Sequence, residues 1–301
     1  MLFRSGCIFS CSFCDYSALG KKKKEFVRSY DSFKQEIVEN HNNFKTTLYT
    51  LTDNIVNDYD EKLKYMIRIR EETGIDFRWA GYLRLDTIKT KEQAKMIADS
   101  GVAGCVFGIE SLKKEVGRYI GKITDKDKII KSAEIFREAV GDNCLTMGSF
   151  ISGLPTETFS ELEQTFEWLH SPEGRNLFDS YTFSTLFLFE GLEDKNEITK
   201  SRNNPFKDYN KIGNKPNRWI SPWGTYNEYS DLATKFNSNS KNILGGFTVP
   251  MIVNMGVPLE SVLKIGRSKF QLPINTLFTK TNYYISEYKN NLLESLNVTG
   301  V

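Results

Sequence analysis

The sequence predicts an α/β fold built on a parallel β-sheet, followed by a mostly helical C-terminal extension. Short apolar, β-branched runs alternate with segments of helical periodicity over residues 1–190. A helix between two strands is the usual crossover in a parallel sheet. The alternation then stops: residues 191–218 are rich in Asn, Lys, Gly and Pro, and apolar stripes at helical spacing follow. We therefore expect a core over residues 1–190 and an extension over residues 191–301.

The predicted strands are short apolar runs, and polar residues follow most of them. The first is very short, and the later ones are apolar almost throughout, which is typical of a sheet covered on both faces. The predicted strands cover residues 1–4, 45–51, 76–83, 103–109, 144–151 and 180–189.

The predicted helices lie between these strands and carry apolar residues at helical spacing. Gly74 and Gly101 follow two of them as stop signals, and residues 111–123, with Gly117 and Gly121, are expected to form a loop. The predicted core helices cover about 31–40, 60–73, 91–100, 124–140 and 158–170. Those of the extension cover about 226–236, 259–269 and 281–296.

The composition is that of a chain with one sizeable buried core. Of the 301 residues, 40% are hydrophobic and 13% aromatic, and no run of about 18 apolar residues predicts a membrane span. The 40 Lys and Arg residues nearly balance the 38 Asp and Glu residues, which does not favour nucleic acid or anionic lipid as a partner. The 5 cysteines are an odd number, and no secretory signal precedes them. We therefore expect reduced cysteines and a cytoplasmic protein.

Three cysteines lie within one short loop after the first predicted strand. Cys7, Cys11 and Cys14 are separated by three and then two residues, whereas Cys105 and Cys144 each stand alone in an apolar run. Iron–sulfur clusters are usually held by four Cys thiolates, so three thiolates leave one iron open to a ligand from outside the protein. The spacing therefore favours a four-iron cluster with an open iron.

Zinc is the alternative metal for such a loop. A structural zinc site normally has four Cys or His ligands, and the two histidines, His41 and His170, lie far downstream on polar helical stretches. The ligand count therefore favours iron and sulfur. A non-catalytic iron–sulfur or zinc-binding protein remains the alternative class of function.

The other polar clusters fall where predicted strands end. In parallel barrels, ligand-binding groups gather at the C-terminal ends of the strands. The cysteines follow the first strand, Asp53 and Asn54 the second, Arg84 and Asp86 the third, Glu110 and Ser111 the fourth, and Gly153–Glu157 the fifth. We therefore expect these side chains to surround one site.

The cysteine triplet, with the aromatic Phe13 directly before its last cysteine, resembles the cluster loop of the radical S-adenosylmethionine (radical SAM) superfamily. The resemblance covers about residues 1–190 and implies that family's partial (β/α)6 TIM-like barrel. It also implies a [4Fe–4S] cluster on Cys7, Cys11 and Cys14, whose open iron is chelated by the amino and carboxylate groups of S-adenosylmethionine.

Four further sites follow from the resemblance. Thr52-Asp53-Asn54 is similar to an acidic second-strand motif of the cobalamin-dependent and methylthiotransferase branches, which implies contact of Asp53 and Asn54 with the amino group of S-adenosylmethionine. Gly108–Ser111 is similar to the fourth-strand motif that binds the ribose or carboxylate, which implies Glu110 and Ser111. Gly148–Glu157 is similar to the fifth-strand motif that packs against adenine, which implies Ile151 and Gly153. Arg84 is expected to pair with the carboxylate, because a guanidinium binds that group bidentately.

The implied activity is that of an enzyme. It would cleave S-adenosylmethionine reductively to a 5′-deoxyadenosyl radical that removes a hydrogen atom from an unidentified substrate, with a flavodoxin- or ferredoxin-type protein as one-electron donor. An RNA-modifying member of the same superfamily is the other reading, which the balanced charge does not favour.

The sequence also departs from the family. Neither a second cysteine cluster nor a cobalamin module is recognisable in the sequence, so we expect a member without those accessory domains. The family's Ser-Arg-Gly-Cys order reads Arg4-Ser5-Gly6-Cys7, and almost no strand precedes it, which puts the completeness of the first barrel edge in question.

Overall fold

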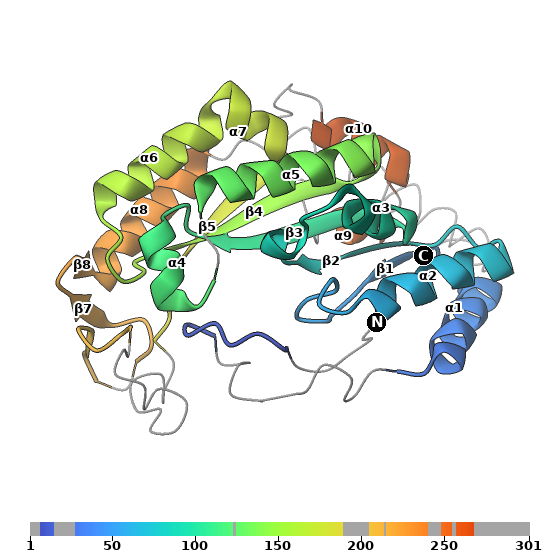
Figure 1. Cartoon of the computed structure of the whole chain (residues 1–301), viewed down its shortest axis with the longest axis horizontal. Coiled ribbons are helices and arrows are strands. Elements are labelled where there is room, and N and C mark those ends of the chain that lie inside the picture. The colour runs from blue at the N-terminus through green and yellow to red at the C-terminus, as the bar shows by residue number, and fades with distance from the viewer. Residues whose placement is uncertain are drawn as a thin grey trace, which may run out of the picture.

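The centre of the computed structural model is a five-stranded parallel sheet with the strand order β1-β2-β3-β4-β5 (Figure 1). The structure describes residues 7–14, 28–122, 125–188, 205–213, 215–239, 248–254 and 257–267. The strands are β1 (Leu48–Thr50), β2 (Arg78–Leu83), β3 (Val102–Glu110), β4 (Leu145–Ser152) and β5 (Ser180–Thr185). This sheet confirms the predicted α/β class, and the first predicted strand, residues 1–4, lies outside the described residues.

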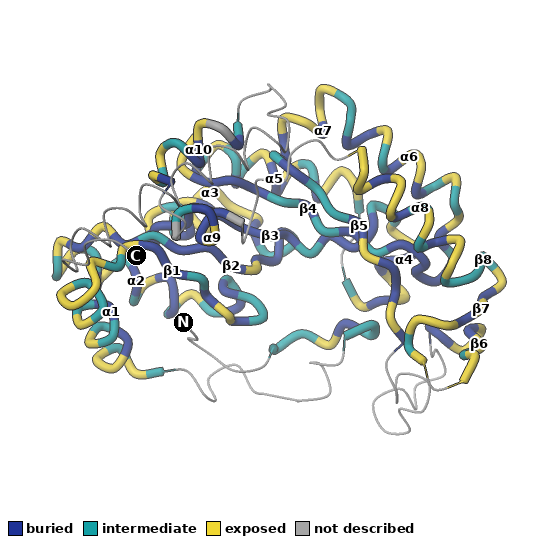
Figure 2. The backbone as a smooth tube through the Cα atoms, turned by 180° about the vertical axis from the view of Figure 1, so that it is seen from behind, coloured by how far each residue is buried: buried dark blue, intermediate teal, exposed yellow. Residues whose placement is uncertain are grey.

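Helices cover the sheet between successive strands, and α3, α5 and α6 lie along one of its faces (Figure 1). The helices of this part are α1 (Tyr30–Phe44), α2 (Asp60–Thr73), α3 (Lys91–Asp99), α4 (Lys114–Ile120), α5 (Lys126–Val140), α6 (Phe159–His170) and α7 (Pro172–Leu177). Two short 3-10 turns, η2 (Leu85–Thr87) and η3 (Gly141–Asn143), join them to strands. Figure 2 shows β2 and β3, in the middle of the sheet, as mostly buried, which agrees with their apolar sequences.

Local sequence signals explain where several helices begin and end. Thr90 and Gln93 form a capping box at the start of α3, in which each side chain bonds the other residue's backbone N–H. Thr158 and Glu161 do the same for α6. Gly74 ends α2 in the left-handed conformation, with a φ of 68°. These signals set where the crossover helices begin and end, and therefore where the neighbouring strands begin and end.

Helix α4 occupies a stretch that we expected to be a loop. Its buried face consists of Val116, Gly117 and Ile120, and Gly121 ends it with a φ of 70°. A helix of seven residues carries too few apolar positions to show a helical period, so the sequence pattern missed it.

The cysteine loop is fastened to α4. The backbone N–H of Ser12 donates to the carbonyl of Ile120 at 3.1 Å, and its hydroxyl donates to the carbonyl of Tyr119 at 3.2 Å. The loop, dark blue in Figure 1, therefore lies beside the last turn of this helix.

The C-terminal part is mostly helical, as predicted. A small antiparallel sheet of β6 (Asn210–Lys211), β7 (Trp219–Ser221) and β8 (Gly224–Thr225) precedes α8 (Tyr226–Asn239), which packs along β5. Helices α9 (Thr248–Asn254) and α10 (Leu259–Arg267) follow. The predicted helix over residues 281–296 lies outside the described residues. In the part of the chain that is described, no helix combines the length and apolar character needed to cross a membrane.

Helices α9 and α10 build a second apolar core at the amino ends of the strands. Leu48, Ala103 and Leu145 from β1, β3 and β4 pack there against Val249 and Val262 of the two helices. The opposite, carboxyl ends of the strands remain available for a site.

Candidate functional site

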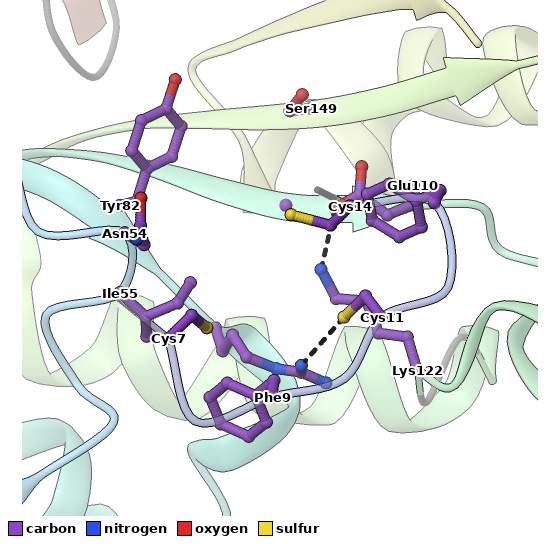
Figure 3. A pocket seen from close by; sticks show the side chains of 13 residues that line it. Cys7, Phe9, Cys11, Cys14, Asn54, Ile55, Tyr82, Glu110, Lys122 and Ser149 are labelled. Atoms are coloured by element: carbon purple, nitrogen blue, oxygen red, sulfur yellow. Dashed lines mark hydrogen bonds and ion pairs between the residues drawn. The ribbon is translucent and has the colours of Figure 1, made fainter. Parts of the chain in front are cut away.

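A cavity of about 310 Å³ lies at the carboxyl ends of the strands (Figure 3). That volume is in the range of small-molecule sites in proteins. The cavity is lined by Cys7, Phe9, Cys11, Phe13, Cys14, Asn54, Ile55, Tyr82, Arg84, Gly108, Glu110, Lys122 and Ser149.

The structure brings most of the predicted site residues to this cavity. Those that line it are Cys7, Cys11, Phe13, Cys14, Asn54, Arg84 and Glu110. Those that do not line it are Asp53, Ser111, Ile151 and Gly153.

The three cysteines of the loop share the cavity although they differ in burial. The side chain of Cys11 is buried, whereas Cys7 and Cys14 are half-buried. The N–H of Cys14 donates to the carbonyl of Cys11 at 3.1 Å, so the chain turns between them. Burial raises the pKa of the Cys7 thiol, and a hydrogen bond from the Phe9 backbone opposes that effect. The loop thus points three thiols into one space.

Arg84 is a cation in direct contact with this loop. Its Nη1 atom lies 3.4 Å from the sulfur of Cys11, and its guanidinium carbon lies 3.8 Å from the centre of the Phe9 ring. Asp86 binds the other edge of the guanidinium through two hydrogen bonds of 2.8 and 2.5 Å. Burial raises the pKa of Asp86, but the pairing with Arg84 outweighs it and lowers the pKa overall.

Glu110 and Lys122 form a nearly buried ion pair on another wall of the cavity. Lys122 Nζ lies 2.8 Å from Glu110 Oε1, and the two side chains are 6% and 9% exposed. Glu110 has a φ of 69°, a left-handed conformation that is strained for a residue with a side chain and that often marks functional sites. A Cβ atom on Gly108 would lie 2.5 Å from the Glu110 carboxylate, so only glycine leaves room for this pair.

Asp53 and Asn54 are directed to different surroundings. Asn54 lines the cavity, whereas the Asp53 carboxylate lies 3.4 Å from Nζ of the fully buried Lys62. Lys62 also pairs with Asp58 at 2.5 Å and donates to the carbonyl of Ile55 at 2.7 Å. Asp53 therefore belongs to a buried ion cluster that holds the loop carrying Asn54.

Ser111 follows Glu110 but does not line the cavity. Its hydroxyl donates to the carboxylate of Glu157 and accepts from the N–H of Lys113 at 3.0 Å. Glu157 is 1% exposed, and burial raises its pKa to about 8 despite the hydrogen bond from Ser111. Ser111 thus links the end of β3 to the turn after β4.

The fifth-strand motif is split between the cavity and the C-terminal part. Ile151 lies on the same face of β4 as Ser149, which lines the cavity, because side chains alternate along a strand. Gly153 has a φ of 84°, and a Cβ atom there would lie 2.7 Å from the Trp219 ring. Its carbonyl accepts a hydrogen bond of 2.8 Å from the Tyr209 hydroxyl. Gly153 therefore lets the aromatic residues of the C-terminal part approach the sheet.

Tyr82, Ile55 and Lys122 line the cavity but were not predicted. Tyr82 was detectable, because it stands two residues before Arg84 and so shares its face of the strand. Lys122 follows α4, the helix that the sequence pattern missed, and nothing local marks it. Ile55 follows Asn54 and carries no polar signal.

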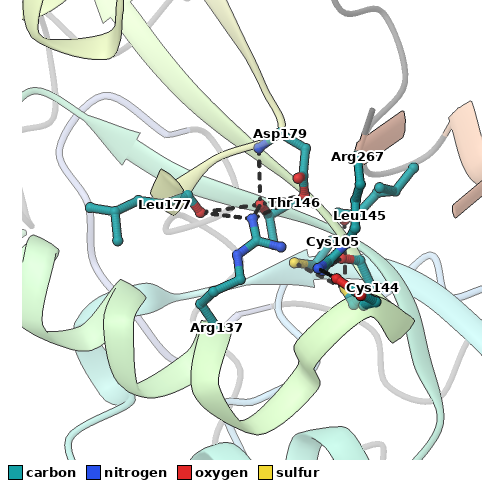
Figure 4. Close-up of polar contacts among 9 residues, drawn as sticks. Cys105, Arg137, Cys144, Leu145, Thr146, Leu177, Asp179 and Arg267 are labelled. Carbon is teal, nitrogen blue, oxygen red and sulfur yellow. Dashed lines mark hydrogen bonds and ion pairs between the residues drawn. The ribbon is translucent and has the colours of Figure 1, made fainter. Parts of the chain in front are cut away.

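Cys105 and Cys144 lie apart from this site, near the amino ends of β3 and β4 (Figure 4). Their sulfurs are 3.8 Å apart, so the two cysteines expected to stand alone are neighbours. Burial raises the pKa of Cys105 well above its ordinary value, and the neighbouring Cys144 adds to the effect. Around them, Arg137 bonds Thr146 and Asp179, and Arg267 of α10 donates to the Cys144 carbonyl at 2.8 Å. This cluster ties α5 and α10 to β4.

The donor set at the cavity includes three cysteine thiols. Among the described residues, no three His, Cys, Asp or Glu side chains are grouped so as to hold one metal ion. A zinc ion draws its ligands to one point, whereas the thiolates of a four-iron cluster each bind a different iron and lie further apart. Thiols are the donors that an iron–sulfur cluster takes, so the three cysteines of the cavity fit such a group.

Comparisons with known proteins agree with this geometry. The chain is 30% identical over 167 residues to a Pyrococcus horikoshii protein described as the uncharacterized methyltransferase PH0819. The match covers 54% of this chain but 34% of the relative, so the chain spans about a third of that protein's length.

Two structures of the radical S-adenosylmethionine methyltransferase TsrM from Kitasatospora setae have a similar fold. One contains cobalamin and a [4Fe–4S] cluster. The match covers 62% of this chain and 34% of the TsrM chain, with a TM-score of 0.51 and 20% sequence identity. The other contains tryptophan and an S-adenosylmethionine analogue. Its match covers 62% of this chain and 36% of the TsrM chain, with the same TM-score and sequence identity. At that identity the likeness shows the fold alone.

The family model of the Radical SAM superfamily matches residues 1–169, more than half of the 301 residues. The matched part contains the cysteine loop, the strands β1 to β4 and every residue of the cavity. The chain therefore belongs to the radical SAM superfamily, whose members are enzymes that use a [4Fe–4S] cluster and S-adenosylmethionine.

Proposed function

We propose that Cys7, Cys11 and Cys14 hold a [4Fe–4S] cluster in the cavity and that S-adenosylmethionine binds beside it. The observation that carries the proposal is that the three thiols share one cavity with residues from the ends of β2 and β3. The bound pair supplies the reductive cleavage of S-adenosylmethionine to methionine and a 5′-deoxyadenosyl radical, which takes a hydrogen atom from the substrate.

The cavity walls supply groups that complement S-adenosylmethionine. Lys122 offers an ammonium group to its carboxylate, and Glu110 offers a carboxylate to the ribose hydroxyls or to its ammonium. The amide oxygen of Asn54 accepts from the same ammonium. Ile151 extends the β4 face beyond Ser149 and provides an apolar surface for adenine.

The other predicted residues act in support. Asp53 fixes Lys62 and so the loop of Asn54, while Ser111 and Gly153 hold the strand ends against Glu157 and Trp219. Phe13 and Phe9 surround the thiols with apolar surface, which limits water at the site. We assign residues 1–190 to this core and residues 191–301 to the extension. A flavodoxin- or ferredoxin-type protein supplies the electron.

Methyl transfer is the second candidate reaction, favoured by the description of the 30% identical relative as a methyltransferase. The products separate the two reactions. Hydrogen abstraction releases 5′-deoxyadenosine, whereas direct methyl transfer from S-adenosylmethionine releases S-adenosylhomocysteine.

The test is anaerobic reconstitution with iron and sulfide, followed by reduction with dithionite and addition of S-adenosylmethionine. We expect four irons per chain and release of 5′-deoxyadenosine and methionine, measured by mass spectrometry. Changing Cys7, Cys11 or Cys14 to Ala should abolish both, while Cys105→Ala and Cys144→Ala should retain both. Equal loss of iron in the Cys105→Ala protein would contradict the assignment of the ligands.

A further inference from the structure

Arg84 occupies a more constrained position than a ligand-binding arginine needs. It is 4% exposed, and Asn57 holds its backbone on both sides. The Asn57 amide accepts from the Arg84 N–H at 2.8 Å and donates to the Arg84 carbonyl at 2.9 Å. The exit of β2 is thus clamped at this residue.

The guanidinium itself has a partner on each of its sides. Nε and Nη2 donate to the two carboxylate oxygens of Asp86, Nη1 faces the Cys11 sulfur at 3.4 Å, and the plane lies over the Phe9 ring. A bidentate grip on a ligand carboxylate requires two free N–H groups along one edge. Asp86 takes the Nε–Nη2 edge, which is one of the two edges that could supply that grip, and Nη1 of the other edge faces the Cys11 sulfur.

The cavity has another cation for an anionic ligand. Lys122 lines the cavity, and its side chain comes from the segment after α4. Both cations line the cavity but differ in their partners: Lys122 pairs with Glu110, whereas Arg84 pairs with Asp86 and faces the Cys11 sulfur.

We propose that Arg84 is a positioning residue that tunes the reduction of the iron–sulfur cluster through its hydrogen bond to Cys11, and that Asp86, Phe9 and Asn57 hold it in place for this. The inference rests on the proposed function, because it takes Cys11 as a cluster ligand. Hydrogen bonds to cluster sulfurs and nearby positive charge favour the form that carries one more electron. The low exposure of Arg84 keeps that interaction from being weakened by water.

The tuned step is the uptake of one electron by the cluster from a flavodoxin- or ferredoxin-type donor. No bond to Arg84 forms or breaks, and no proton moves from it. Asp86 offsets part of the charge of Arg84, so the directed hydrogen bond carries more of the effect than the net charge does. An ammonium in place of the guanidinium should therefore reproduce the effect only in part.

The experiment is a potentiometric titration of the reconstituted protein without S-adenosylmethionine, followed by electron paramagnetic resonance of the reduced cluster. In Arg84→Gln we expect the equilibrium constant for one-electron reduction to fall about tenfold, which corresponds to a potential lower by about 59 mV. Arg84→Lys should fall between this variant and the wild type. Arg137→Gln is the matched control, because Arg137 is also paired with an aspartate but lies at the other end of the sheet, and its potential should equal that of the wild type.

A second measurement covers the case in which Arg84→Gln fails to load iron. Phe9→Leu removes the ring beneath the guanidinium and leaves its charge, so resonance Raman spectra should show shifted iron–thiolate stretching bands in the loaded protein. Unchanged potentials in both Arg84 variants, together with weaker binding of S-adenosylmethionine, would overturn the inference and return Arg84 to the ligand site. If the wild type itself binds no four-iron cluster, both the proposed function and this inference are wrong.

Discussion

Lys122 Nζ lies 2.8 Å from Glu110 Oε1, and helix α4 lies between the two residues in the sequence. The pair places opposite charges on one wall of a cavity that also holds three cysteines. Its position suits a zwitterionic ligand, because each charge of the pair can exchange its partner for the complementary group of the ligand.

We expect Lys122→Met to weaken the binding of S-adenosylmethionine by roughly 1.5–3 kcal/mol, the range for hydrogen bonds to charged groups. Binding is measured by anaerobic calorimetry on protein with full iron content. Lys113→Met is the matched control, since Lys113 pairs with Glu161 outside the cavity. Equal affinities of Lys122→Met and the wild type would remove Lys122 from the binding site.

Substitutions of the neighbouring residues Asp53 and Asn54 should have different effects on stability and on ligand binding. Asp53→Ala leaves Lys62 and Asp58 in a buried cluster with altered charge, and breaking such a pair costs about 3–5 kcal/mol of unfolding free energy. Asn54→Ala removes only a cavity wall, so it should weaken ligand binding with little change in stability. Thermal unfolding and ligand titration of the two variants separate the effects. A stable Asp53→Ala protein that no longer binds S-adenosylmethionine would assign the contact to Asp53 instead.

The buried Glu157 predicts a specific dependence of stability on pH. Burial raises its pKa from 4.5 to about 8, so between these values the folded chain binds a proton that the unfolded chain has released. The folded state therefore loses stability as pH rises through this window, by an amount on the order of a few kcal/mol. Glu157→Gln mimics the neutral acid and should flatten that slope. Melting temperatures from about pH 5 to about pH 9 provide the measurement, and a parallel slope in the variant would show that other groups cause it.

The contact between Gly266 and Leu145 should limit what α10 tolerates. A Cβ atom on Gly266 would lie 2.3 Å from a methyl carbon of Leu145, so Gly266→Ala should cost about 1–3 kcal/mol of unfolding free energy. Leu145→Val on its own should cost less, because it removes one methylene. The double variant should recover part of the loss from Gly266→Ala, as urea unfolding would reveal. Additive losses would mean that the helix shifts away rather than pressing on Leu145.

The parts of the site that follow from strand ends were predictable, because parallel strands bring their carboxyl ends to one edge. That argument brought the cysteines, Asn54, Arg84 and Glu110 together without any knowledge of contacts. It cannot decide which of two adjacent residues faces the cavity, since that depends on the buried Lys62 nine positions beyond Asp53. It also cannot place Lys122, which depends on a helix too short to show a period.

The apolar patterns likewise predicted helices but not the residues against which these helices pack. The stripe in residues 259–269 indicated a helix, and α10 occupies most of it. Nothing in that stripe indicates that it packs on Leu48, Ala103 and Leu145, because those partners lie far away in the sequence. Long-range packing of this kind depends on shape complementarity between whole elements.

The second apolar core has a consequence for how the protein is made. Its strand residues, Leu48, Ala103 and Leu145, leave the ribosome long before Val262 and Leu263, which cover them. Ser149 is the last cavity residue in the sequence. Once it has been synthesised, the chain contains every cavity residue, while the amino ends of the strands are not yet covered by α9 and α10. A nascent chain in that state exposes apolar surface that favours aggregation or chaperone binding. Helices α9 and α10 therefore cover the amino ends of the strands only after every cavity residue has been made, and they do so at the end of the sheet opposite the cavity.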